Sequence, residues 1–253
     1  MANKEPSMHD LIIETHVGLK RQGPGSPEMV EKALGFLDGL EKISKVADLG
    51  CGTGGQTMVL AENISGTITG IDICPDFIHV FNENAKKLEL AERVHGVVGS
   101  IEELPFPKEE LDLVWSEGVI DSIGFGKGIN YWNEFLKKNG YLAVTCPSWL
   151  TDERPREIEK FWTDAVQGID TVADNILTMQ KAGYAFVASF VLPEECWLDH
   201  YFIPRNEAEE TLVKKYGGSK VLEDYLEGEK YEIELLLQYK QYYGYVFYIG
   251  QKI

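Results

Sequence analysis

The chain has few cysteines and no long apolar run. Its four cysteines lie far apart and form no C-x-x-C pair, which excludes the usual spacing of a zinc site and favours reduced thiols over disulfides. No apolar stretch approaches the length needed to span a bilayer, so we expect no membrane partner. The segment from Met1 to Asp10 is polar and lacks the apolar core of a secretory signal. The sequence therefore predicts a soluble, cytoplasmic protein without a bound metal.

Basic residues are also scarce. The 253 residues include 24 Lys and Arg against 41 Asp and Glu, which gives a net charge of −17, and the basic residues form no run. Such a charge repels a phosphate backbone and argues against nucleic acid as a partner. The hydrophobic fraction of 44% is typical of a globular protein with a sizeable core.

Short apolar strands alternate with helical segments through most of the chain. Strands are predicted at 45–49, 67–72, 94–98, 111–116, 141–145, 184–192 and 243–249. A helix is predicted over 129–138, with Gly140 as its stop signal. Alternation of this kind predicts an α/β fold, a Rossmann-like doubly wound and mostly parallel seven-stranded sheet, whose ligands lie at the carboxyl ends of the strands.

Two segments lie outside this alternation. Residues 1–44 are predicted to form an N-terminal helical cap, in which a second helix starts at Pro27 behind an N-capping Ser26 and runs to about residue 40. Residues 193–242 form a helical insert between two parts of the core, 45–192 and 243–253. We interpret the insert as a lid over the substrate; the alternative is a helical pair that covers the sheet edge and forms a homodimer contact.

A glycine-rich turn follows the first predicted strand. Gly50, Gly52 and Gly55 have the G-x-G-x-x-G spacing, which alone is also compatible with a dinucleotide. Asp48 stands before the first glycine, where a carboxylate would crowd a pyrophosphate but suits a cationic ammonium group. The stretch from Asp48 to Gly54 resembles the first motif of the class I S-adenosyl-L-methionine-dependent methyltransferases.

Further residues fit this resemblance. Asp72 ends the second strand, where a carboxylate is placed to accept from both ribose hydroxyls; the alternative is a cap for the next helix. The resemblance implies that Ile73 packs on the adenine face and that Ser100 and the Ile101 amide contact the adenine edge. Many relatives carry an acid where Ser100 stands, so this contact is expected to carry less charge. Ser116 is expected beside the cofactor at the end of the fourth strand.

Candidate acceptor residues come from two places. Glu117 and Gly118 close the fourth strand, where donor and acceptor should meet, and a buried Glu117 would serve as a general base. In the insert, Trp197, His200 and Tyr201 are candidates for an aromatic wall and a histidine base; the alternative is a core-packed aromatic cluster.

The resemblance implies transfer of a methyl group from S-adenosyl-L-methionine to a small-molecule acceptor by in-line displacement. It points to small-molecule enzymes of the ubiquinone/menaquinone-biosynthesis type. Two alternatives stay open. An NAD-dependent oxidoreductase satisfies the glycine spacing, although no polarising Tyr and Lys pair stands out. A non-catalytic S-adenosylmethionine-binding scaffold would use the insert as an interface.

Overall fold

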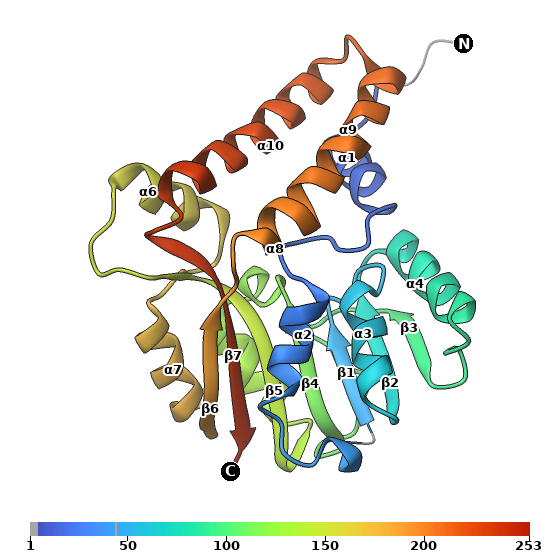
Figure 1. Ribbon diagram of the computed structural model, residues 1–253, viewed down its shortest axis with the longest axis vertical. Helices are drawn as coiled ribbons and strands as arrows, with labels where there is room; N and C mark the ends of the chain where they lie inside the picture. Colours follow the sequence, from blue (N-terminus) through green and yellow to red (C-terminus); the bar gives the residue numbers. More distant parts are fainter. Residues whose placement is uncertain (1–4, 44) are drawn as a thin grey trace.

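The computed structural model describes residues 5–43 and 45–253, which form a single seven-stranded sheet with helices on both faces and a helical cap above it (Figure 1). The strands are β1 (Lys45–Leu49), β2 (Thr67–Asp72), β3 (Val94–Val98), β4 (Leu111–Glu117), β5 (Leu136–Trp149), β6 (Tyr184–Val191) and β7 (Tyr243–Lys252). The helices are α1 (Met8–His16), α2 (Pro27–Leu34), α3 (Gly55–Asn63), α4 (Pro75–Lys87), α5 (Phe125–Asn133), α6 (Arg156–Ala165), α7 (Val172–Lys181), α8 (Glu195–Trp197), α9 (Ile203–Tyr216) and α10 (Lys220–Tyr239). Short turns are η1 (Leu40–Lys42), η2 (Ile120–Ser122) and the π-helical η3 (Leu198–Phe202).

The sheet order confirms the predicted fold class. The strands run β3-β2-β1-β4-β5-β7-β6, and β7 is antiparallel to both of its neighbours while the pairs from β3 to β5 are parallel. The order of the strands changes direction at β1, because β2 lies on one side of β1 and β4 lies on the other. The carboxyl ends of β1, β2 and β4 therefore meet at one edge, beside the point at which a doubly wound sheet binds ligands.

Alternate residues of each central strand face opposite helical layers. Val46 belongs to the apolar core that contains residues of α2, α3 and α4, whereas Ala47 belongs to the core that contains residues of α5 and α7. The period of two in a strand thus places buried side chains on both faces. This burial on both sides holds the strand ends rigidly, which is what a site at that edge requires.

The cap combines the first helix with helices of the insert that precedes β7. Helices α1, α9 and α10 share a small apolar core of Leu11, Leu212, Leu222 and Tyr225 and stand clear of the sheet (Figure 1). At the base of the cap, Arg205 is fully buried and forms ion pairs with three glutamates of α9 and α10. Within the described residues, no helix has both the length and the apolar character to cross a membrane.

Two predicted helices differ from the structure. The helix from Pro27 begins behind the Ser26 cap as expected but ends at Leu34, because Gly35 provides its C-terminal cap. The helix predicted over 129–138 is wrong, since α5 ends at Asn133 and β5 already starts at Leu136, which pairs with Leu111. Gly140 lies inside β5, where a β-carbon would come within 2.9–3.2 Å of three carbonyl oxygens.

Candidate functional site

The glycine-rich turn joins β1 to α3 at the ligand edge of the sheet. The φ angles of Gly50, Gly52 and Gly54 are +73°, +54° and +89°, values that residues with a β-carbon rarely adopt. A β-carbon on Gly50 would lie 2.5 Å from Val119, and one on Gly52 would lie 2.0 Å from the Gln22 side-chain oxygen. Backbone conformation therefore favours glycine at all three positions, and the close approach of Val119 adds a second reason at Gly50.

Asp48 lies beneath this turn rather than in a cavity. Its carboxylate is fully buried and accepts hydrogen bonds from the Thr57 hydroxyl and, at 3.5 Å, from Gln56 Nε2. Burial raises the Asp48 pKa to about 7, although the hydrogen bonds oppose this shift. The Asp48 side chain thereby stabilises the start of α3. Its hydrogen-bond partner Gln56 lines a cavity at the ends of β1, β2 and β4.

Asp72 faces the turn from the end of β2. Its carboxylate accepts the Gly52 N–H at 2.9 Å and the Cys74 N–H at 2.8 Å, so it braces both the turn and the entry to α4. Burial raises the Asp72 pKa, opposed by these backbone hydrogen bonds. Next to it, the Ile73 side chain is 77% exposed and leaves a free apolar surface.

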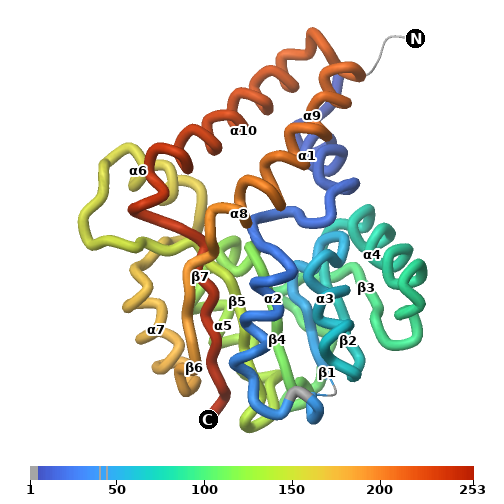
Figure 2. The backbone as a smooth tube through the Cα atoms, viewed as in Figure 1, coloured from blue at the N-terminus to red at the C-terminus, as the bar shows by residue number. Residues whose placement is uncertain are grey.

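The segment from residue 17 to residue 26, which we call the strap, lies over the glycine-rich turn. It leads from α1 across the strand ends to α2 (Figure 2). Gln22 Oε1 accepts the Thr53 N–H, and Gln22 Nε2 donates to the Thr53 hydroxyl, each at 2.9 Å. At its far end the Gly25 N–H donates to the Cys196 carbonyl of the insert at 3.3 Å. The strap therefore ties the cap to the turn.

An ion pair joins the strap to the end of β4. The Arg21 guanidinium donates to Glu117, and the two side chains are only 7% and 4% exposed. Glu117 also accepts the Trp115 indole N–H at 2.8 Å. Burial raises the Glu117 pKa, while the charge of Arg21 and the indole hydrogen bond oppose that shift.

These residues enclose a cavity of about 130 Å³, which we call the strand-edge cavity. Its walls are formed by the strap and by the ends of β1, β2 and β4, and include Gly50, Gly52, Asp72, Glu117 and Gly118. The sequence analysis predicted all five for the site, and the structure brings them together.

Three other predicted cofactor residues, Ser100, Ile101 and Ser116, do not line this cavity. The Ser116 hydroxyl is buried and donates to the Leu49 carbonyl at 2.8 Å, so it joins β4 to β1. The Ser100 hydroxyl accepts the Glu102 N–H at 3.1 Å within its own turn. Among the described residues, the Ile101 N–H has no hydrogen-bond partner, which leaves it available to an acceptor.

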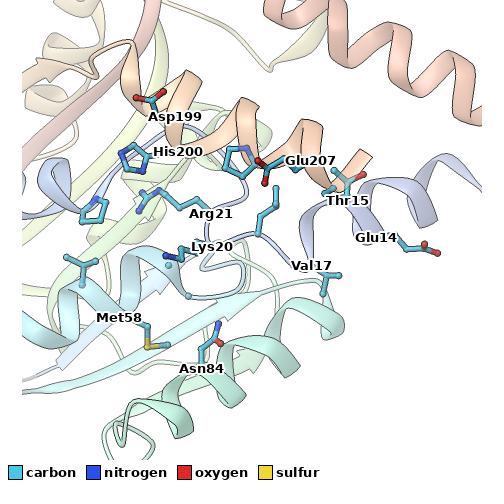
Figure 3. Close-up of a pocket in the computed structure, with 18 of the residues that line it drawn as sticks. Glu14, Thr15, Val17, Lys20, Arg21, Met58, Asn84, Asp199, His200 and Glu207 are labelled. Atoms are coloured by element: carbon cyan, nitrogen blue, oxygen red, sulfur yellow. The ribbon is translucent and has the colours of Figure 1, made fainter. Parts of the chain in front are cut away.

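The three predicted insert residues have different surroundings. Trp197 is buried with its ring 5.1 Å from that of Tyr245, and the hydroxyl of the buried Tyr201 lies 3.1 Å from His16 Nε2. His200 alone faces open space, in a second cavity of about 1160 Å³ between cap and core (Figure 3). We call this second cavity the cap cleft. Trp197 and Tyr201 thus occupy the positions of core-packed aromatics, and the three residues do not form one wall.

A family described as "Methyltransferase domain" matches residues 40–195, which is more than half of the chain. The chain belongs to the class I S-adenosylmethionine-dependent methyltransferases. The family cofactor is S-adenosyl-L-methionine, as the resemblance predicted. These comparisons give no support to the nicotinamide-dependent alternative.

Individual relatives are distant from this methyltransferase. A probable tocopherol O-methyltransferase of Oryza sativa is 36% identical over 92 residues, which are 35% of this chain and 25% of the relative. A demethylmenaquinone methyltransferase of Staphylococcus aureus is 34% identical over 90 residues, 35% of this chain and 33% of the relative. The match thus spans a third or less of either curated relative.

Among solved structures, a methyltransferase from Thiobacillus denitrificans in complex with S-adenosyl-L-homocysteine has a TM-score of 0.83 at 19% identity. The alignment covers 96% of this chain and 98% of that one. At such low identity the likeness shows the fold, including the cap, and does not assign an acceptor.

Sequence reasoning missed Arg21 and Gln22, the two strap side chains that reach the turn. Two polar side chains directly before the Gly23-Pro24-Gly25 run, upstream of the first strand, were the available signal.

Proposed function

We propose that this methyltransferase transfers the methyl group of S-adenosyl-L-methionine to a small-molecule acceptor by in-line displacement. One observation supports the location of the cofactor: the glycine-rich turn, Asp72 and Glu117 meet in the strand-edge cavity, at the reversal of strand order. Glycines with positive φ let a ligand lie against the backbone there. When bound, the cofactor supplies an activated methyl group on a sulfonium.

Residues that line the cavity and residues beside it have separate roles in this proposal. The Asp72 carboxylate accepts from the ribose hydroxyls, Ile73 packs on the adenine, and the Ile101 N–H donates to a ring nitrogen. Arg21 binds the carboxylate of the amino-acid portion, because its guanidinium lines the strand-edge cavity beside the glycine-rich turn. Asp48 acts indirectly, by holding α3 in place through Thr57 and Gln56.

The strap has to move for this ligand to enter. The strand-edge cavity measures about 130 Å³, whereas small-molecule sites start at roughly 300 Å³. Gln22 fills the space beside Gly52, and its hydrogen bonds to Thr53 are ones that a ligand can replace. Displacement of the strap would enlarge the cavity and uncover the N-terminus of α3. The cap and insert are therefore proposed to act as a lid.

Positioning supplies much of the rate of such a transfer, because the sulfonium is already a good leaving group. Glu117 lies beside Gly118 at the floor of the cavity and is proposed to accept a proton from the acceptor. Burial raises the Glu117 pKa and the charge of Arg21 opposes that shift, so movement of Arg21 toward the cofactor carboxylate would make Glu117 a stronger base. The tocopherol and demethylmenaquinone relatives are named for small-molecule acceptors, which supports an acceptor of that kind here.

Calorimetric titration tests the cofactor site. We expect S-adenosyl-L-methionine and S-adenosyl-L-homocysteine to bind with micromolar dissociation constants, near −8 kcal/mol, and NAD not to bind. Asp72→Ala should weaken cofactor binding by about 1–3 kcal/mol. Asp76→Ala, in the first turn of α4 and outside the cavity wall, is the matched control and should leave it unchanged.

Two results would count against the proposal. Binding of NAD in place of S-adenosyl-L-methionine would favour an NAD-dependent oxidoreductase over the proposed methyl transfer. Tight cofactor binding without turnover on any acceptor in a broad small-molecule screen would favour the non-catalytic scaffold instead.

A further inference from the structure

His16 lies where α1, the strap and the insert meet. It is the last residue of α1, it is buried, and its ring centroid lies 5.9 Å from that of Tyr201 in η3. Its carbonyl oxygen accepts a hydrogen bond from Gln22 Nε2 of the strap at 3.1 Å. The residue therefore contacts the insert through its ring and the strap through its backbone.

The hydrogen bonds of the His16 ring determine its tautomer. Nδ1 lies 2.8 Å from the Ile12 carbonyl oxygen, which can only accept, so Nδ1 carries the hydrogen of the neutral ring. Nε2 lies 3.1 Å from the Tyr201 hydroxyl oxygen and therefore accepts the Tyr201 hydrogen. The Tyr201 oxygen in turn accepts from the Arg205 guanidinium at 3.4 Å. Every group in this chain of hydrogen bonds is satisfied only while the His16 ring is neutral.

Protonation of His16 would disrupt the chain of hydrogen bonds. A hydrogen on Nε2 would point at the Tyr201 oxygen, which already accepts from Arg205, and the Tyr201 hydrogen would lose its acceptor. Within residues 5–43 and 45–253, the Tyr201 hydroxyl has no other hydrogen-bond partner. Because Tyr201 is buried, a hydroxyl hydrogen without an acceptor destabilises this packing.

The acids near the His16 ring are engaged elsewhere. The titratable side chains around the chain of hydrogen bonds are Tyr201 on η3, Arg205 and Glu209 on α9, and Tyr225, Glu229 and Glu232 on α10. The three glutamates form ion pairs with Arg205, and the Tyr225 hydroxyl donates to Thr15. In the described part of the chain, no carboxylate forms an ion pair with the His16 ring. A proton added to the ring therefore gains no counter-charge.

The charged groups of the cap cleft do not supply a counter-charge either. Further charged side chains near this point line the cap cleft, whose lining does not include His16: Lys20, Arg21, Asp199, His200 and Glu207. Glu14, on the same helix as His16, is engaged by Lys215 Nζ at 2.7 Å. Burial lowers the His16 pKa; the hydrogen bond to the Ile12 carbonyl opposes this shift, and the charge of Arg205 adds to it.

The strap connects His16 to the glycine-rich turn. Gln22 Nε2 donates to the carbonyls of His16 and Leu19, at 3.1 and 3.0 Å. The same side chain bonds the N–H and the hydroxyl of Thr53, and the Thr53 hydroxyl donates to the Leu19 carbonyl at 2.9 Å. The end of α1, the strap and the turn thus form one hydrogen-bonded unit. The bond between Tyr201 and His16 attaches this unit to the insert.

We infer that His16 is a proton-sensitive joint, whose neutral ring holds the strap closed over the glycine-rich turn and whose protonation releases the strap. This regulation of the cofactor site rests on the proposed function, in which the strap moves to admit the cofactor. Mildly acidic conditions should therefore favour the open strap.

The direction of the pH effect distinguishes His16 from the acids of the same region. A histidine whose pKa is lowered in the closed state stabilises that state above about pH 6.5, and this contribution is lost as pH falls through the lowered pKa. Glu229 has the opposite effect, because burial raises its pKa to about 7 and it binds its proton more tightly in the closed state. The same holds for Glu209, Glu117 and Asp72, whose pKa values burial also raises. Among these groups, His16 alone opens the strap in acid.

Hydrogen exchange of the Thr53 N–H measures opening of the strap, because Gln22 Oε1 is its hydrogen-bond acceptor. The full chain without cofactor is compared with His16→Gln at pH 8 and pH 5.5, and each rate is divided by the intrinsic exchange rate at that pH. With a histidine pKa of about 6.5 in the open state, one proton raises the open population at most about tenfold at pH 5.5. We expect the rate of the unaltered chain relative to His16→Gln to rise about three- to tenfold between pH 8 and pH 5.5.

Three further variants assign this response to the joint. His9→Gln changes an exposed histidine of the same helix and should keep the full response. Glu229→Gln should keep it as well, because Glu229 acts in the opposite direction. Tyr201→Phe removes the hydroxyl in both protonation states of His16. In this variant Thr53 should exchange at least threefold faster than in the unaltered chain at pH 8, and the response relative to His16→Gln should disappear.

The joint is refuted if the unaltered chain and His16→Gln respond to pH alike, or if Glu229→Gln abolishes the response. It is also refuted if Thr53 exchanges as slowly in Tyr201→Phe as in the unaltered chain at pH 8. Calorimetry with S-adenosyl-L-methionine separates the two proposals. A chain that binds no cofactor refutes the proposed function whatever its exchange rates, whereas normal cofactor binding without the pH response of Thr53 refutes only the joint.

Discussion

Arg21→Met tests the contact that joins the strap to the core. The substitution keeps an apolar side chain of similar length and removes the cation from an ion pair whose members are 7% and 4% exposed. Removal of one partner from a buried pair costs about 3–5 kcal/mol, because the other charge stays buried. With an m value of about 3 kcal/mol/M in urea, the unfolding midpoint should fall by roughly 1–1.7 M.

The loss should depend on pH in a defined direction. Burial raises the Glu117 pKa even with Arg21 present, and removal of Arg21 raises it further. An acid whose pKa is raised by folding favours the folded state below its unfolded pKa, and this contribution is lost as pH rises through the folded pKa. The difference in unfolding free energy between the unaltered chain and Arg21→Met should therefore be larger at pH 8 than at pH 5.

Two further variants make the result decisive. Arg21→Met combined with Glu117→Gln should be more stable than Arg21→Met alone at pH 8, because no buried charge remains. Lys160→Met removes an exposed ion pair with Asp164 and should cost less than about 1 kcal/mol. The reasoning fails if the two substitutions of the double variant are additive, or if Arg21→Met costs no more than Lys160→Met.

Gly52→Ala should raise the cofactor dissociation constant at least tenfold in calorimetry, because a β-carbon at a φ of +54° strains the turn on which the cofactor is proposed to lie. Gly228→Ala in α10 meets no atom within 4 Å and should instead stabilise the fold by about 0.5–1 kcal/mol in urea unfolding. Arg205→Leu should destabilise the chain by about 3–5 kcal/mol at pH 8. The loss of stability in Arg205→Leu should be smaller at pH 6, because burial raises the Glu229 pKa to about 7 and protonation of Glu229 removes its uncompensated charge. Native thiols should react slowly with iodoacetamide at pH 8, apart from the partly exposed Cys74, because burial raises the pKa of the other three cysteines.

Local sequence signals were sufficient for most of the sheet. The predicted ranges 45–49, 67–72 and 94–98 coincide with β1, β2 and β3, because short β-branched runs bounded by turn residues leave little alternative. The failure at 129–138 has a non-local cause. Leu136 is drawn into the sheet by pairing with Leu111, and the positive φ of Asn139 then turns the chain before Tyr141. Neither effect is visible in the helical period of that stretch.

The candidate site likewise contains residues that local sequence patterns predict and residues that they do not. Asp72 and Gly52 could be predicted, since each ends a strand or begins a turn and the topology of a doubly wound sheet brings those ends together. The partners from the strap could not, because Gln22 meets Thr53 across 31 residues and Arg21 meets Glu117 across 96. Such contacts depend on where the cap sits, which no local pattern of the strap determines.

In the insert, the sequence did not predict the direction in which individual side chains point. Trp197, His200 and Tyr201 lie within five positions, and their residue types suited an aromatic wall with a base. They fall in and beside the π-helical turn η3, whose wider spacing changes the direction of successive side chains. Trp197 and Tyr201 consequently turn into the core, and His200 alone reaches the cap cleft. The proposed donor site thus follows from the topology of the core, whereas side-chain directions in the cap depend on packing between distant segments.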